Sequence, residues 1–224
     1  MDIKALRKET KLPLSLLKEA IELADGRKEN LKASLVRATT NYAKKFKNNV
    51  TRFKTYGYFI SEDKTSGVII SLLSETRSHT SLEVLSEFAC VLAQNIYDGI
   101  CVDEDIDEML NGVISYLGEN VTLSEIWRLP KQDDNFILAT QNYYLGQGLL
   151  IVRLEIEDET KTKDLLDRIA RTYPLFFKQF YQDRKSGFTV SSLEEYCSQR
   201  TIEHVSRAYP KGFVKISDIK FLGI

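Results

Sequence analysis

Few residues of the chain stand at spacings that could support metal binding. Asp103, Asp105 and Asp107 imitate the start of a calcium-binding loop. Such a loop also needs Gly at its sixth position and Glu at its twelfth, and the chain has Glu108 and Ile114 there. We therefore expect these acids to stand at a helix N-terminus, where negative charge complements the helix dipole.

The chain also lacks the arrangements that bind nucleotides or activate a nucleophile. Gly146-Gln147-Gly148 begins a Gly-x-Gly pattern, but Ile151 takes the place of the third glycine and no helix is expected after it. Cys90 is expected to be a buried small hydrophobe on a helix. His79 is expected in a loop and His204 in a helix, and neither belongs to a Ser/His/Asp pattern. These residues predict no enzyme, no cofactor, no metal site and no direct nucleotide binding.

The composition is that of an ordinary soluble globular protein, with 43% hydrophobic and 28% charged residues. A length of 224 residues allows one large domain or two small ones. No apolar run reaches the ~18 residues of a membrane span, and the segment Met1–Lys4 lacks the apolar core of a secretory signal. Three cysteines without a CxxC pair favour a reducing compartment. We expect a cytoplasmic protein, or a processed mitochondrial one, outside any membrane.

The net charge of -1 conceals an uneven distribution. Residues 1–60 contain fourteen Lys and Arg against six Asp and Glu, a net +8, and residues 61–224 contain seventeen against twenty-six, a net -9. Residues 78–127 contain ten acids and no Lys or Arg. This asymmetry suggests two modules with different surfaces and a charged partner. The acidic stretch could face a basic partner or the second subunit of a homodimer.

Hydrophobic spacing predicts three short helices in residues 1–40. The first covers residues 2–10, the second runs from Pro13 to about Ala24, and the third carries Leu31 and Leu35, four residues apart. Asp25-Gly26 is expected to end the second helix. Three helices of this length enclose a very small core, so we expect this module to be marginally stable alone.

A basic linker is predicted at residues 41–54. It interleaves cations with aromatic rings, namely Lys44, Lys45, Lys47, Arg52 and Lys54 with Tyr42, Phe46 and Phe53. Such a segment could stack on RNA bases. The alternative is a solvated linker whose Phe46 and Phe53 dock on the next module, and the acidity of the whole chain favours it.

The remaining residues predict an α+β fold with antiparallel sheets, because strands are grouped rather than alternating with helices. Strands are expected at 56–60 and 67–73, around a loop at Ser61–Ser66. Thr80 and Glu83 form a capping box before an apolar helical stripe from Leu82 to Ile96. A second helix ends at Gly118. Further strands are expected at 121–129, 135–141, 149–156 and 213–221, with helices around 165–170 and 191–208. The predicted subdomains are 55–117 and 118–224, the second with a divergent C-terminal tail.

Several short stretches, in order and at matching spacing, resemble the elongation factor Ts family. The family's opening motif LRxxTGAGxxxCKxAL is similar to residues 6–21, its GIILEV strand to 67–70 and its IGENI motif to 117–120. Its GVLV strand is similar to 148–151, and the helix ending VAASKP to 169–174. The resemblance covers about residues 3–177. It implies an N-terminal three-helix module of the ubiquitin-associated type, followed by a core of two antiparallel-sheet-plus-helix subdomains.

The same resemblance implies a function without chemistry, namely guanine-nucleotide exchange on elongation factor Tu in its GDP-bound or nucleotide-free state. The implied contacts in the first module include the apolar Leu12 and Leu14, expected to be exposed, with Ser15 and Lys18. The implied contacts in the core include Leu117, Gly118 and Tyr143, the last in place of a family histidine.

The chain departs from the family in its partner-binding loop. The family's TDFV motif corresponds to Thr76-Arg77-Ser78-His79, of which only Thr76 matches. A cationic Arg77 should avoid a magnesium ion, and Ser78 lacks the volume of a phenylalanine wedge. Two family arginines correspond to Ser124 and Glu125. Three functions stay open: an exchange factor, a stabiliser of elongation factor Tu without exchange, and an adaptor that binds ubiquitin-type or RNA partners through residues 1–40.

Overall fold

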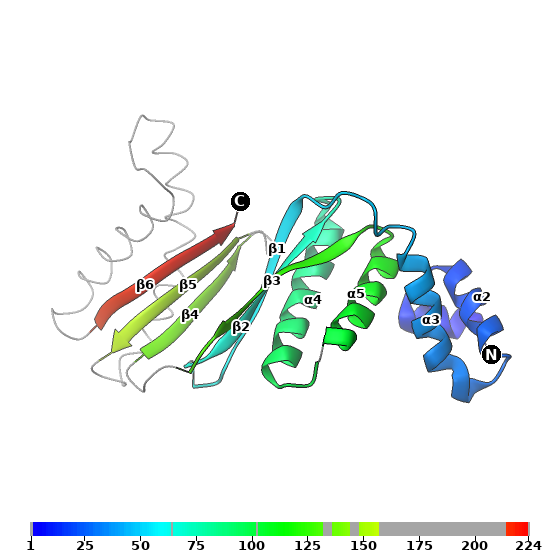
Figure 1. Cartoon of the computed structure of the whole chain (residues 1–224), viewed down its shortest axis with the longest axis horizontal. Coiled ribbons are helices and arrows are strands. Elements are labelled where there is room, and N and C mark those ends of the chain that lie inside the picture. Colours follow the sequence, from blue (N-terminus) through cyan, green and yellow to red (C-terminus); the bar gives the residue numbers. More distant parts are fainter. Residues whose placement is uncertain are drawn as a thin grey trace. The chain divides into compact units, whose positions relative to one another are not determined.

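The computed structural model describes residues 2–63, 65–101, 103–131, 136–143, 148–156 and 214–223 (Figure 1). The chain divides into two compact units, which are considered separately. One contains Met1–Tyr58 and Ile69–Trp127, and the other contains Phe59–Val68 and Arg128–Ile224. The described residues combine helices with small antiparallel sheets, so the predicted α+β class is confirmed.

The first unit begins with the three predicted helices. They are α1 (Ile3–Thr10), α2 (Leu14–Leu23) and α3 (Leu31–Ala43), with a 3-10 turn η1 (Lys28–Asn30) before α3. The side chain of Asp2 accepts a hydrogen bond from Lys4 N at 2.9 Å and caps α1. α2 ends at the predicted place, where Asp25 and Gly26 both adopt positive φ.

The small helical core lies between α2 and α3. Leu16, Ala20 and Ala38 are fully buried, and Leu12, Leu35 and Tyr42 pack against them. Leu12 is therefore half-buried rather than exposed as expected, because its side chain joins this core. α3 is also tied to the next part of the unit, since Ser115 Oγ donates to the carbonyl oxygen of Thr39 at 3.1 Å.

The predicted hairpin is confirmed as β1 (Phe53–Ile60) and β2 (Gly67–Ser74). Hydrogen bonds close it at both ends, from Ser61 N to Ser66 O at 3.0 Å and from Arg52 N to Ser74 O at 2.8 Å. The sheet order is β1-β2-β3, with β3 at Val121–Leu129. β2, the central strand, is buried at seven of its eight residues, so both of its faces are covered.

Two helices, α4 (His79–Tyr97) and α5 (Asp103–Leu117), lie side by side along this sheet (Figure 1). Gly57 on β1 allows a very close approach, because a Cβ there would lie 2.4 Å from the backbone of Ala89 in α4. Cys90, the next residue, is half-buried rather than fully buried as predicted. It follows the point of closest backbone contact and does not enter the core.

The beginning of α4 differs from the prediction. Its N-cap is Ser78, not Thr80, because Ser78 Oγ accepts a hydrogen bond from Ser81 N at 3.1 Å. The cap therefore lies two residues before the predicted one, and His79 is the first residue of the helix rather than a loop residue. Serine in extended backbone conformation is a strong N-cap, which explains why the helix begins here.

The two ends of α5 agree with the sequence. Asp103 and Asp105 occupy its first turn together with Glu104, and Asp107 follows within the helix, so the prediction that these aspartates stand at a helix N-terminus is confirmed. Gly118 ends it, with φ of 70° and a hydrogen bond from its N–H to Ile114 O at 2.8 Å. In the described part of the chain, no helix is long and apolar enough to cross a membrane.

The second unit contains a separate antiparallel sheet of order β4-β5-β6. Its strands are Phe136–Tyr143, Gly148–Ile156 and Val214–Gly223, close to the predicted segments. Phe136 pairs with Glu155 and Tyr143 with Gly148, while the β5–β6 register shifts between Arg153 and Leu154. The helices predicted around 165–170 and 191–208 lie outside the described residues.

Candidate functional site

Two connections of the first unit exchange hydrogen bonds reciprocally. Thr76 N, in the β2–α4 loop, donates to Glu119 Oε2 at 2.9 Å, and Asn120 N, before β3, donates to Glu75 Oε1. Each acid thus accepts the backbone N–H that follows the other acid. We call Glu75, Thr76, Glu119 and Asn120 the acidic clasp. Glu119 and Asn120 are 6% and 3% exposed, so the clasp is closed to water on the side of the α5–β3 turn.

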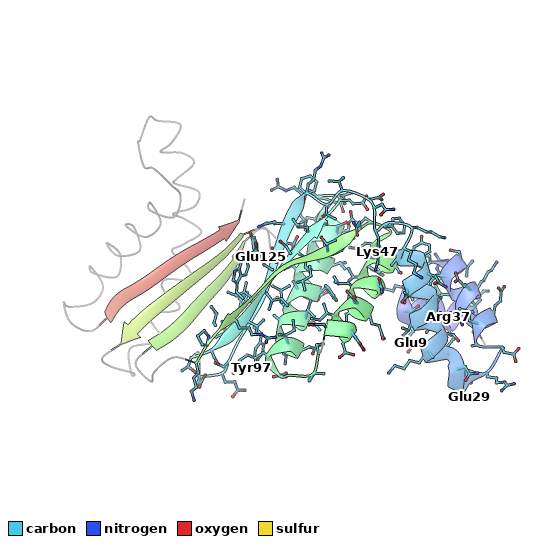
Figure 2. All side chains as sticks on the ribbon, in the orientation of Figure 1. Glu9, Glu29, Arg37, Lys47, Tyr97 and Glu125 are labelled. Carbon is cyan, nitrogen blue, oxygen red and sulfur yellow. The ribbon has the colours of Figure 1, made fainter. Side chains whose placement is uncertain are left out.

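A third segment, which follows α3, joins the clasp. The side-chain amide of Asn120 donates to Asn49 O at 2.7 Å and to Lys47 O at 3.4 Å. The amide of Asn49 donates to Glu75 Oε1 at 3.0 Å. Figure 2 labels Lys47 where the chain leaves α3 for β1. Three segments far apart in sequence are therefore held together by two carboxylates and two asparagines.

The clasp supports the predicted partner loop, Thr76–His79, whose four residues are all exposed. Ser74 Oγ donates to Thr76 O at 3.0 Å, so the peptide groups on both sides of Thr76 are fixed. Ser78 Oγ also donates to Ser81 Oγ at 2.7 Å. The loop is therefore short, ordered between the clasp and the α4 cap, and available to a partner.

The sequence analysis identified one member of the clasp, Thr76, and the neighbours Leu117 and Gly118, but missed Glu75, Glu119 and Asn120. Leu117 and Gly118 were expected to bind the partner, yet they end α5, and Gly118 provides the positive φ that the turn requires. The contacts with the loop come from the next two residues, Glu119 and Asn120. Both belong to the stretch 117–120 that resembles the family's IGENI motif. Two polar residues directly after a helix-ending glycine are the sequence feature that could have identified them.

The other predicted site residues lie elsewhere in the fold. Leu14 is 40% exposed at the beginning of α2, and Ser15 and Lys18 are also exposed on this helix. Leu12, as noted, packs into the helical core. Tyr143 ends β4 in the second unit, whereas the partner loop belongs to the first.

The aromatic residues of the basic segment pack within the chain. The ring centroids of Tyr42 and Phe46 lie 5.4 Å apart at an interplanar angle of 53°, and Lys45 Nζ lies 4.8 Å from the centre of the Tyr42 ring. Tyr42 also packs on the helical core. These contacts favour a docked segment over a stacking surface for RNA. Phe46 thus packs against Tyr42 of the preceding helix, while its predicted docking on the next module stays a prediction.

Tyr56 on β1 has a shifted pKa and interacts with Glu125 on β3, one of the positions that differ from the family. Tyr56 is 3% exposed, and its ring stacks with Trp127 at a centroid distance of 6.4 Å. Burial raises the pKa of Tyr56, and the carboxylate of Glu125 raises the same pKa further. Glu125, labelled in Figure 2, is exposed on β3 where the family has an arginine. An acid therefore stands at the position where the resemblance implied a cation.

Comparison with known proteins gives one recurring name. No family model matches the chain. Two curated relatives are both named elongation factor Ts, from the Clostridium botulinum strains Alaska E43 (type E3) and Eklund 17B (type B). Each is 26% identical over 226 residues, covering 90% of this chain and 73% of the relative. The chain is therefore distantly similar to elongation factor Ts over most of its length.

Proposed function

We propose that the protein is a translation elongation factor of the elongation factor Ts type, which binds elongation factor Tu and promotes release of GDP. The observation that carries this proposal is the similarity to elongation factor Ts over 90% of the chain. The exposed and ordered loop at Thr76–His79 supports it, because it offers a partner a preformed contact surface. The proposal places the protein in the cytoplasm.

The proposed mechanism requires no acid, base or nucleophile. The factor binds the GDP-free state of its partner more tightly than the GDP-bound state. By linkage, the factor weakens the binding of GDP by the same factor as GDP weakens the binding of the factor. We further propose that α1, α2 and α3 form a ubiquitin-associated-type module that docks through Leu14, Ser15 and Lys18. The loop at Thr76–His79 would then act on the nucleotide site.

The second candidate is binding without exchange, and the α4 cap favours it. Because the Ser78 hydroxyl caps α4, this residue contributes to the helix rather than serving as a wedge. Arg77 adds positive charge where the family motif has an acid. A protein with these two residues could bind and stabilise elongation factor Tu while leaving GDP in place.

One stopped-flow experiment separates the two candidates. Elongation factor Tu from the same organism is loaded with a fluorescent GDP analogue and mixed with excess unlabelled GDP and increasing amounts of the protein. We expect release to accelerate and then saturate. Calorimetric binding without acceleration would support the stabiliser instead. Absence of both binding and acceleration would reject the two candidates together.

A further inference from the structure

We propose that Glu119 is a positioning residue, whose buried carboxylate holds the loop Thr76–His79 in the geometry that acts on the partner. The inference rests on the proposed exchange function. It begins from the bond between Thr76 N and Glu119 Oε2 at 2.9 Å, which joins residues 43 positions apart. Thr76 and the α4 cap at Ser78 bracket Arg77, so the clasp determines where Arg77 leaves the protein surface.

The surroundings of Glu119 indicate that this carboxylate is not there for stability alone. Its side chain is 6% exposed, and among the described residues Oε1 has no hydrogen-bond partner. Burying a carboxylate with one oxygen unpaired costs free energy. An apolar residue of similar size would avoid that cost but could not accept the Thr76 N–H. The acid therefore has a role that stability does not explain, and fixing the loop is that role.

The second half of the clasp, at Glu75, attaches the partner loop to two other segments of the chain. Glu75 accepts from Asn120 N and from the amide of Asn49, and Asn120 in turn holds the carbonyl oxygen of Asn49 at 2.7 Å. The loop is thereby attached to the segment that follows α3 as well as to the α5–β3 turn. Both ends of the β2–α4 loop have fixed anchors, so a partner that contacts the loop meets it in one conformation.

The test compares substitutions of Glu119 in the full-length protein by the GDP-release assay. In Glu119→Gln the side-chain carbonyl can still accept the Thr76 N–H, and the other oxygen of Glu119, Oε1, has no hydrogen-bond partner among the described residues to lose. We expect its saturating rate to stay within about twofold of wild type. In Glu119→Ala the saturating rate should fall about tenfold, the order expected when one hydrogen bond to a charged group is lost. Glu87→Ala, an exposed acid of α4, is the matched control and should leave the rate unchanged.

The shape of the concentration dependence separates positioning from loss of folding. A variant that is partly unfolded has fewer active molecules, so it needs more total protein to reach the same saturating rate. A mispositioned loop lowers the saturating rate itself. If Glu119→Ala does not fold, Glu119→Asp serves instead, because it keeps the charge and withdraws the carboxylate by one methylene group. We expect the same lowered saturating rate from it.

Two results would overturn the inference while the proposed function stands. One is a wild-type saturating rate in folded Glu119→Ala or Glu119→Asp. The other is a loss in Glu119→Gln as large as that in Glu119→Ala. If the wild-type protein itself gives no acceleration, the exchange function has failed. Hydrogen exchange of the Thr76 amide, expected to be faster in Glu119→Ala than in Glu119→Gln, then decides whether the clasp holds the loop.

Discussion

At the scale of single residues, Tyr56 shows how the fold changes an ordinary side chain. Its ring is buried on β1 beside Trp127, and desolvation raises the pKa of its hydroxyl, with a further contribution from Glu125. The charged phenolate is thus disfavoured in the folded protein. In the unfolded chain the same group titrates near its ordinary pKa of 10.0.

The raised pKa of Tyr56 predicts a loss of stability at alkaline pH. Above about pH 10 the unfolded chain releases this proton more readily than the folded protein, so the free energy of unfolding falls as pH rises. Tyr56→Phe keeps the stacked ring and removes the titrating hydroxyl, so its stability should decline less steeply. Urea unfolding of both proteins between pH 7 and 11 measures the difference. Parallel pH profiles would show that Tyr56 titrates alike in both states.

At the scale of elements, the beginning of α4 is set by one hydroxyl. Ser78 Oγ accepts the Ser81 N–H at 3.1 Å, whereas Thr80, the alternative cap, is already inside the helix. Ser78→Ala should lower the free energy of unfolding by about 1 kcal/mol. Thr80→Ala should change it by less than about 0.5 kcal/mol, as at other exposed positions without a special role. Urea denaturation of the two variants distinguishes the caps. A larger loss of unfolding free energy in Thr80→Ala than in Ser78→Ala would show that Thr80 is the cap.

The cap also limits how the partner loop can be altered. Replacing Ser78 with phenylalanine would supply a wedge but remove the α4 cap, so any change in GDP release would combine two effects. Arg77→Asp replaces a cation by an acid outside α4 and leaves the Ser78 cap in place. It is therefore the cleaner variant for asking whether the family's acid restores exchange.

The described helices and strands could be predicted from hydrophobic spacing because burial of one face follows from local sequence. Leu16 and Ala20 are four residues apart and both enter the helical core. The α4 cap was misplaced because Ser78 and Thr80 are both good capping residues. Their spacing does not say which one adopts the extended backbone before the helix.

At the scale of the whole molecule, the candidate site depends on contacts that no local pattern contains. Thr76 and Glu119 are 43 residues apart, and Asn49 lies 71 residues from Asn120. Family resemblance identified the loop and the stretch 117–120 separately. Only the folded chain shows that they meet, and that the conspicuous Gly118 shapes the turn while its polar neighbours make the contacts.

The uneven charge of the chain is the other property of the whole molecule, and it predicts salt-dependent self-association. Residues 1–60 carry a net +8 and residues 61–224 a net -9, while the total of -1 gives little mutual repulsion between molecules. At about 0.02 M salt, charges on separate molecules interact over more than 10 Å, and at 0.3 M they are largely screened. We expect the average sedimentation coefficient to rise as salt is lowered.

Substitution of the acids at the start of α5 tests the origin of this effect. Asp103, Glu104 and Asp105 are exposed and belong to the stretch 78–127, which has no Lys or Arg. Changing all three to the neutral amides should weaken association at low salt, because the basic segments of a second molecule lose their attraction. A sedimentation coefficient that does not depend on salt in the wild-type protein would contradict the prediction. If the sedimentation coefficient of the triple variant depends on salt as that of wild type does, other acids make the contact.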